Sequence, residues 1–278
     1  MTTDEKVEKI QEIIKLKVLG VWEARHTEAG HRYANLQTGH IVDSVTTQIG
    51  AVIAKPHLIK WAIKMALNWL LGGDRLEKLR NIHSREEMFA GAMLAHTDFR
   101  DEAGSVGSLA HSGVERWLND GIASGVLSDD ITKFAVVNCD PRAIAAMRSV
   151  EKLFKDKNIT PIATELLVGD IRYSAGQLDA LVFWENDLCL LDWKSSNQVS
   201  QEYILQAVAY LKFFESMTLL KIKKIKIVQM NKDKDKYTVY NVGNITPSWR
   251  AFKQLCGLYK WRKDRKNVLE KDVKHIIL

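Results

Sequence analysis

Residues 176–194 constrain the fold of this chain more than any other stretch. They read GQLDALVFWENDLCLLDWK, in which 178–184 and 188–191 are apolar with few breaks. Asn186 and Asp187 separate the two runs and have the composition of a tight turn. Two apolar runs joined in this way predict a β-hairpin whose strands are both largely buried.

Acidic residues interrupt this apolar pattern at two places, Asp179 near the start of the first strand and Asp192 at the end of the second. Pairing about the turn brings them close together, and Lys194 projects to the same face as Asp192. Two carboxylates repel each other unless a cation lies between them, and Mg²⁺ accepts such ligands while keeping positions for water and phosphate. A buried Asp–Lys pair without any metal is the alternative, because buried charges are usually paired.

Four motifs follow one another in a fixed order along the chain. They are Gly107-Ser108-Leu109-Ala110-His111 with Glu115 one turn later, Gly176-x-x-Asp179, Asp192-x-Lys194 and Gln206-x-x-x-Tyr210. This combination resembles the PD-(D/E)XK nuclease superfamily, and most closely its RecB-like branch, which includes phage and mitochondrial genome-maintenance exonucleases. The resemblance covers residues 100–230 well and the N-terminal part more loosely.

The resemblance implies an α/β fold with a central mixed β-sheet flanked by helices, a restriction-endonuclease-like core, and a helical N-terminal cap. It also implies a Mg²⁺- or Mn²⁺-dependent nuclease that hydrolyses DNA phosphodiesters. The metal ligands would be His111, Asp179, Asp192 and the backbone carbonyl of Trp193. The catalytic residues would be Asp179, Asp192, Lys194, which orients or deprotonates the water, and Glu165 on the preceding strand. An outward-facing Glu on an edge strand is the alternative for Glu165.

Further residues are candidates for contacts with DNA. The resemblance places Gln206 and Tyr210 against the substrate backbone, although a Tyr packed on the sheet is an equal alternative. Hydroxyl groups commonly donate to phosphate, and Trp rings stack on single-stranded bases. The residues with these possible roles are Ser44, Thr46, Thr47 and Trp61. A helix cap is the alternative for the hydroxyl residues, and a core position for the tryptophan.

Composition favours an acidic partner and excludes some cofactors. The 278-residue chain has a formal net charge of +6, which suits a polyanion such as DNA. Its three cysteines are far apart and cannot supply the four ligands of the iron–sulfur cluster found in some members of the branch. No apolar run is long enough to span a membrane and no Arg-rich leader is present, so we expect a cytoplasmic protein, in the host if it is phage-encoded, without a membrane partner.

The sequence therefore predicts a nuclease of DNA replication, recombination or repair that prefers single strands or free ends, with an exonuclease favoured over an endonuclease. A catalytically silent DNA-end-binding protein on the same fold is one alternative. A structural or regulatory α/β protein that binds metal but no nucleic acid is another.

We expect one continuous globular chain with two regions. Residues 1–97 are predicted to form a mostly helical, DNA-contacting cap, and residues 98–278 the nuclease core. The predicted helices are 4–19, 55–71, 74–96 with Ser84 as a cap and Glu87 in the capping-box position, 98 or 101 to 118, 141–155, 200–217 and 247–263. The predicted strands outside the central hairpin are 33–36, 41–42, 162–168, 171–173, 225–230 and 237–242.

Overall fold

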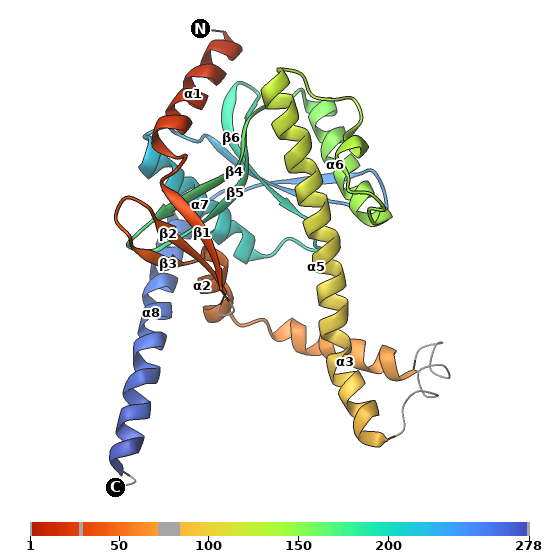
Figure 1. Cartoon of the computed structure of the whole chain (residues 1–278), viewed down its shortest axis with the longest axis vertical. Coiled ribbons are helices and arrows are strands. Elements are labelled where there is room, and N and C mark those ends of the chain that lie inside the picture. Colours follow the sequence, from red (N-terminus) through yellow and green to blue (C-terminus); the bar gives the residue numbers. More distant parts are fainter. Residues whose placement is uncertain (1, 28–29, 72–83, 277–278) are drawn as a thin grey trace. The chain divides into compact units, whose positions relative to one another are not determined.

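The chain divides into two compact units (Figure 1). The computed structural model describes residues 2–27, 30–71 and 84–276. The larger unit comprises Met1–Ile53 and Ala110–Leu278, and the smaller unit comprises Ala54–Leu109. The larger unit is mixed α/β, with a central mixed sheet flanked by helices, which confirms the predicted fold class.

A five-stranded sheet of order β4-β5-β6-β7-β8 forms the centre of the larger unit. Its strands are β4 (Thr160–Asp170), β5 (Ser174–Trp184), β6 (Asp187–Lys194), β7 (Lys224–Met230) and β8 (Tyr237–Asn241). Neighbouring strands are antiparallel except β6 and β7, which are parallel and are connected by helix α7 (Gln201–Thr218). A parallel pair needs such a crossover, whereas the antiparallel pairs are joined by short turns.

The predicted central hairpin is confirmed as β5 and β6, but its turn lies at Glu185 and Asn186 rather than at Asn186 and Asp187, because Asp187 already belongs to β6. Trp184 pairs with Asp187, and the turn residues Glu185 and Asn186 have φ values of 54° and 62°. Positive φ at both central positions is the conformation of the two-residue turn that matches the twist of a hairpin. The strand predicted at 171–173 is wrong, because these residues form the turn between β4 and β5.

A second sheet precedes the central one in the chain. It has the order β1-β2-β3, with β1 (Trp22–Thr27), β2 (Gly30–Asn35) and β3 (Ile41–Asp43). The hairpin predicted from 33–36 and 41–42 is confirmed by the pairing of β2 with β3, whereas β1 was not predicted. A bridge between Ser44 and Ala175 connects this segment to β5. Residues 1–53 therefore belong with the central sheet rather than with a separate helical cap.

Helices pack on the central sheet from several parts of the chain. The helices that contact its strands include α1 (Thr3–Lys17), α2 (Val45–Val52), α6 (Pro141–Lys157) and α7, whereas α8 (Ile245–Ile276) packs against α2 and α7, and the short 3₁₀ helix η1 (Ile131–Phe134) packs against α6. Helix α7 has eight buried residues, among them Phe213 and Phe214, which pack with Leu178 and Leu190 of the sheet in the main core. None of the described helices combines the length and apolar character that a membrane span needs.

The smaller unit consists of α3 (Pro56–Leu71) and the first part of α5 (Arg85–Ser124). Helix α3 and the cap at Ser84 were predicted correctly, but α5 is one continuous helix from Arg85, where two helices were predicted, the second starting at 98 or 101. The predicted helical residues 74–83 lie outside the described residues. Ser84 Oγ accepts from the Glu87 backbone N–H over 3.1 Å and so caps the helix. The predicted boundary between 97 and 98 falls inside this 40-residue helix, so the division into regions differs from the one expected.

Candidate active site

Asp192 and Lys194 form the buried centre of the candidate site. Both lie on β6 and, because side chains alternate along a strand, they project to the same face. Lys194 Nζ lies 2.7 Å from Asp192 Oδ2, and Asp192 is completely buried. Asp192 Oδ1 has no hydrogen-bond donor among the described residues. Burial raises the pKa of Asp192 to about 6 although Lys194 opposes the rise, and the charge of Asp179 adds to it.

Asp179 lies beside this pair on the neighbouring strand β5. The Trp193 backbone N–H donates to Asp179 Oδ2 over 2.6 Å, so the main chain of β6 holds the carboxylate in place. Burial raises the pKa of Asp179, while the charge of Lys194 and the Trp193 N–H oppose the rise. The structure thus brings both predicted acids and the lysine together at one end of the hairpin.

His111 approaches the carboxylates from α5. Its Nδ1 lies 3.9 Å from Asp179 Oδ2, and its ring donates to the Trp193 carbonyl. Burial and the charge of Lys194 lower the pKa of His111 to about 4, so the imidazole is neutral at neutral pH. A neutral imidazole is a competent metal ligand. The predicted ligands His111 and Trp193 are adjacent, but in this arrangement they bond to each other.

Glu165 is the third carboxylate of the cluster. It interrupts β4 with a φ of 50°, a value that non-glycine residues rarely adopt in a strand. Burial raises its pKa to about 9, and repulsion from Asp179, Glu115 and Asp192 contributes further. Glu165 is therefore not the outward-facing edge residue considered as the alternative, because its side chain shares the electrostatic environment of the two aspartates.

The carboxylates of this site are of the chemical type that binds a hard divalent cation, although they do not surround a point as a complete set of ligands. Among the described residues, no group of three or more His, Cys, Asp and Glu is arranged to hold a metal ion. Asp179 and Asp192 nevertheless present carboxylates with raised pKa values, and Asp192 Oδ1 has no donor. A cation such as Mg²⁺ would relieve the repulsion between these groups and take oxygen ligands from them. The metal remains a prediction.

Gln206 and Tyr210 lie on one face of α7, as their spacing predicts. Gln206 Nε2 donates to the Tyr210 hydroxyl over 3.2 Å. Tyr210 is only 4% exposed and packs against Gly176, the first residue of the Gly-x-x-Asp motif. This placement corresponds to the packing role considered for Tyr210, and the predicted contact of the two residues with DNA remains a prediction.

Gly176→Ala is expected to destabilise the chain by about 1–3 kcal/mol, because a small-to-large change in a packed core forces its neighbours to move. An added Cβ would lie 2.5 Å from Tyr210 Cε1 and 2.7 Å from the Tyr210 hydroxyl oxygen. Urea denaturation followed by circular dichroism measures the change. Gly104→Ala is the control, since its Cβ would meet nothing within 4 Å on exposed α5. It should be neutral or stabilise by up to about 1 kcal/mol. Equal effects of the two changes would contradict the packing argument.

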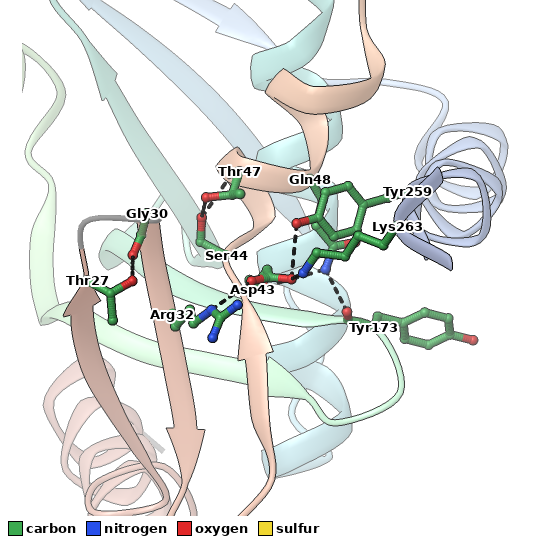
Figure 2. Close-up of polar contacts among 10 residues, drawn as sticks. All are labelled: Thr27, Gly30, Arg32, Asp43, Ser44, Thr47, Gln48, Tyr173, Tyr259 and Lys263. Carbon is green, nitrogen blue, oxygen red and sulfur yellow. Dashed lines mark hydrogen bonds and ion pairs between the residues drawn. The ribbon is translucent and has the colours of Figure 1, made fainter. Parts of the chain in front are cut away.

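The predicted phosphate-binding hydroxyls gather at the start of α2, where Ser44 is the N-cap (Figure 2). Ser44 Oγ accepts from the Thr47 backbone N–H over 2.9 Å and lies 2.8 and 3.0 Å from the hydroxyls of Thr47 and Thr46. Ser44 is buried, so its hydroxyl serves the helix cap that was the alternative reading. Of the three residues, only Thr46 is fully exposed.

Asp43 anchors this turn to two distant elements (Figure 2). Its Oδ1 lies 3.1 Å from Arg32 Nε of β2, and its Oδ2 accepts from the Tyr259 hydroxyl at 3.0 Å and from Lys263 Nζ at 2.6 Å. Tyr259 and Lys263 belong to α8. These two residues of α8 therefore hold the end of the N-terminal sheet.

Trp61 lies in the smaller unit. Its ring packs edge to face against His96, with 6.3 Å between the ring centroids, and the side chain is half-buried. This is the packing role considered for it.

Tyr203 is a residue of the site that the sequence analysis missed. The Lys194 ammonium lies 4.9 Å from the centroid of the Tyr203 ring, and the Tyr203 hydroxyl donates to Ser196 Oγ over 3.2 Å. A cation over an aromatic face is held electrostatically. The signal was its spacing, because Tyr203 precedes Gln206 by three residues and shares its helix face.

Comparisons with known proteins do not identify the chain. No protein-family model matches the sequence, and no curated protein matches it. Among solved structures, the crystal structure of SSO0001 is similar over 54% of this chain and 74% of that chain, with 16% identity and a TM-score of 0.26. A TM-score this low supports no conclusion about function.

Proposed function

We propose that this chain is a metal-dependent nuclease that hydrolyses phosphodiester bonds of DNA and prefers single strands with a free end. The observation that carries the proposal is the buried cluster of Asp179, Asp192 and Lys194, with Glu165 in electrostatic reach. A structural ion pair needs one carboxylate for each ammonium. Crowding three carboxylates around one lysine costs stability, and such perturbed groups gather where chemistry is done.

Each residue has a role that follows from its surroundings. A bound Mg²⁺ or Mn²⁺ would supply Lewis-acid chemistry at the phosphate and lower the pKa of a water. Asp179 and Asp192 would hold it, with the neutral imidazole of His111 beside them. Burial lowers the pKa of Lys194, but Asp192 and Asp179 outweigh burial and raise it. Lys194 therefore stays protonated and would stabilise phosphate charge as a donor, rather than deprotonate water.

The preference for DNA ends rests on the resemblance to exonucleases, and the net charge of +6 suits a polyanionic partner. A cytoplasmic role in DNA replication, recombination or repair belongs to the same proposal.

The test is digestion of end-labelled linear single-stranded DNA beside covalently closed circular single strands, with Mg²⁺, with Mn²⁺ and with EDTA. We expect the linear strand to be degraded with either metal, the circle to survive, and Lys194→Ala to be inactive. Cutting of the circle would mean an endonuclease with the same chemistry. The absence of cutting in both metals would overturn the proposal.

A silent DNA-binding protein is the second candidate, and one observation favours it. Asp192 already pairs with Lys194 at 2.7 Å, so part of the site is neutralised without a metal. DNA binding that weakens with salt, without any cutting, would support this candidate.

A further inference from the structure

A polar cavity of about 250 Å³ opens at the carboxyl ends of β6 and β7. It is lined by Ser196, Asn197, Gln229, Met230, Asn231, Lys232, Asp233, Lys236, Tyr237 and Thr238. β6 and β7 are the parallel pair of the central sheet. In α/β sheets, ligands bind preferentially beyond the carboxyl ends of parallel strands, where the chain leaves the sheet. The cavity occupies this kind of position.

The cavity adjoins the candidate active site through the sheet itself. Gln229 is the register partner of Lys194, and Ser196 follows Lys194 by two residues. Gln229 Nε2 donates to the Ser196 carbonyl over 2.8 Å, and its Oε1 accepts from the Tyr240 hydroxyl over 3.2 Å. These two bonds hold the Gln229 side chain beside Ser196, so the cavity lies next to the segment that follows Lys194.

The lysines that line the cavity, Lys232 and Lys236, lie on an ordered turn. Asn231 Oδ1 accepts from the backbone N–H groups of Asp233 and Lys234, each over 2.9 Å. Ser149 of α6 donates to the Asn231 carbonyl over 3.3 Å, which ties the turn to the body of the fold. The lysines on this turn are therefore presented from a defined position rather than from a loose loop.

Lys232 and Lys236 leave positive charge in the cavity. In the part of the chain that the structure describes, neither ammonium lies within ion-pair distance of a carboxylate. Lys232 is half-buried, and burial, with the charge of Arg142, lowers its pKa, although the charge of Asp233, which also lines the cavity, opposes the fall. The nearby Asp140 carboxylate is already paired with Arg142 at 2.7 Å. A partly buried ammonium without a carboxylate partner is stabilised by an external anion.

We propose that this cavity binds a phosphate group of the nucleic-acid strand next to the one that is cut. The inference rests on the proposed function and adds a second binding position to it. Lys232 and Lys236 would supply the charge, and Asn197 and Thr238 neutral donors, which is the usual mixture at phosphates. The volume of about 250 Å³ suits one phosphate with its sugar. The phosphate is either internal to the strand or that of a released mononucleotide.

The test uses the turn itself as its control. Lys232, Lys234 and Lys236 lie on one turn, but Lys234 does not line the cavity. We would measure binding of the full chain to a labelled single-stranded oligonucleotide in EDTA over a series of salt concentrations. Lys232→Gln and Lys236→Gln should each weaken binding several-fold and reduce the salt slope by about 0.7, the value for one phosphate contact on a single strand. Lys234→Gln should leave both unchanged.

The outcomes separate this inference from the proposed function. Equal weakening by Lys234→Gln, or unchanged binding in the other two variants, would overturn the inference while cleavage by the wild-type chain would still support the nuclease. A wild-type chain that neither binds nor cuts DNA would overturn both. Competition by a mononucleotide that Lys232→Gln abolishes would assign the cavity to the released product, and its failure to compete would assign the cavity to an internal phosphate.

Discussion

Asp192→Asn is expected to lower DNA cleavage by at least about 10²- to 10³-fold, the usual cost of removing a group that stabilises charge in the transition state. Asn has the same shape as Asp but cannot carry the negative charge that a metal ion would require. Lys194 would still lie near the charge of Asp179, which already acts on its pKa, so the lysine is not left without a counter-charge. We therefore expect loss of activity in a chain that folds.

Asp187→Asn is the matched control for this experiment. Asp187 lies on the same strand at its other end, where its Oδ2 is 3.0 Å from Lys224 Nζ at the surface. The same chemical change there should leave cleavage unaltered. Circular dichroism of both variants shows whether they are folded. Full cleavage by Asp192→Asn would remove Asp192 from the catalytic residues and favour a different centre for the reaction.

The centre of the site could be predicted because it depends on local sequence. Two apolar runs and a turn near residue 186 were enough to bring Asp179 close to Asp192, whereas the register that sets them opposite each other depends on the turn being Glu185 and Asn186. Lys194 follows from the period of two in a strand. The helix face with Gln206 and Tyr210 was likewise readable from spacing, although spacing could not show that Tyr210 is buried against Gly176.

Contacts between distant segments could not be predicted in this way. Tyr259 and Lys263 reach Asp43 from 216 and 220 residues away, and no periodic pattern records such a pairing. A basic run at a helix end reads as a solvated or DNA-binding surface until its partner is known. The cap of α5 at Ser84 was predicted, whereas the continuity of this helix beyond residue 96 was missed. Gly104 lies in open space inside this continuous helix, although glycine is costly in a helix interior.

The backbone conformation of Glu165 could not be predicted from the sequence either. Its φ of 50° turns the side chain at a position where a regular strand would have continued the alternation. The strand pairs around it are Thr164 with Ala180 and Leu166 with Leu178, so Glu165 stands opposite Asp179 in the register. A distortion of this kind costs free energy, and such distortions collect at functional sites.

Glu165 leads to the second prediction, which concerns stability. In the absence of divalent cations, the free energy of unfolding is expected to fall as the pH rises from about 6.5 to 8, by up to about 2 kcal/mol. The folded chain raises the pKa of Glu165 from 4.5 to about 9. Between these values the folded state keeps a proton that the unfolded state has lost, so raising the pH favours unfolding.

The pH window limits the contributions of the other groups, except that Asp179, whose pKa burial also raises, would add to the fall. Asp192, with a pKa of about 6, also makes the free energy of unfolding fall as the pH rises, but mainly below the window. His111, whose pKa falls from 6.5 to about 4, has the opposite effect, also below it. Burial raises the pKa values of Cys189 and Cys256, and these thiols would add to the loss only where unfolded cysteines ionise, above the window.

Urea denaturation at several pH values, for the wild-type chain, Glu165→Gln and Glu12→Gln, measures this dependence. Glu165→Gln should remove most of the fall because an amide does not titrate, whereas Glu12→Gln, an exposed position on α1, should keep it. Mg²⁺ should flatten the wild-type curve, since a bound cation stabilises the ionised carboxylates. A wild-type stability that is constant over the window would mean that Glu165 is ionised and solvated, and it would remove Glu165 from the carboxylate cluster. If stability falls with pH and Mg²⁺ does not change that fall, the carboxylate cluster is supported but the predicted metal site is not. A cation bound there would have to relieve the repulsion among Glu165, Asp179 and Asp192.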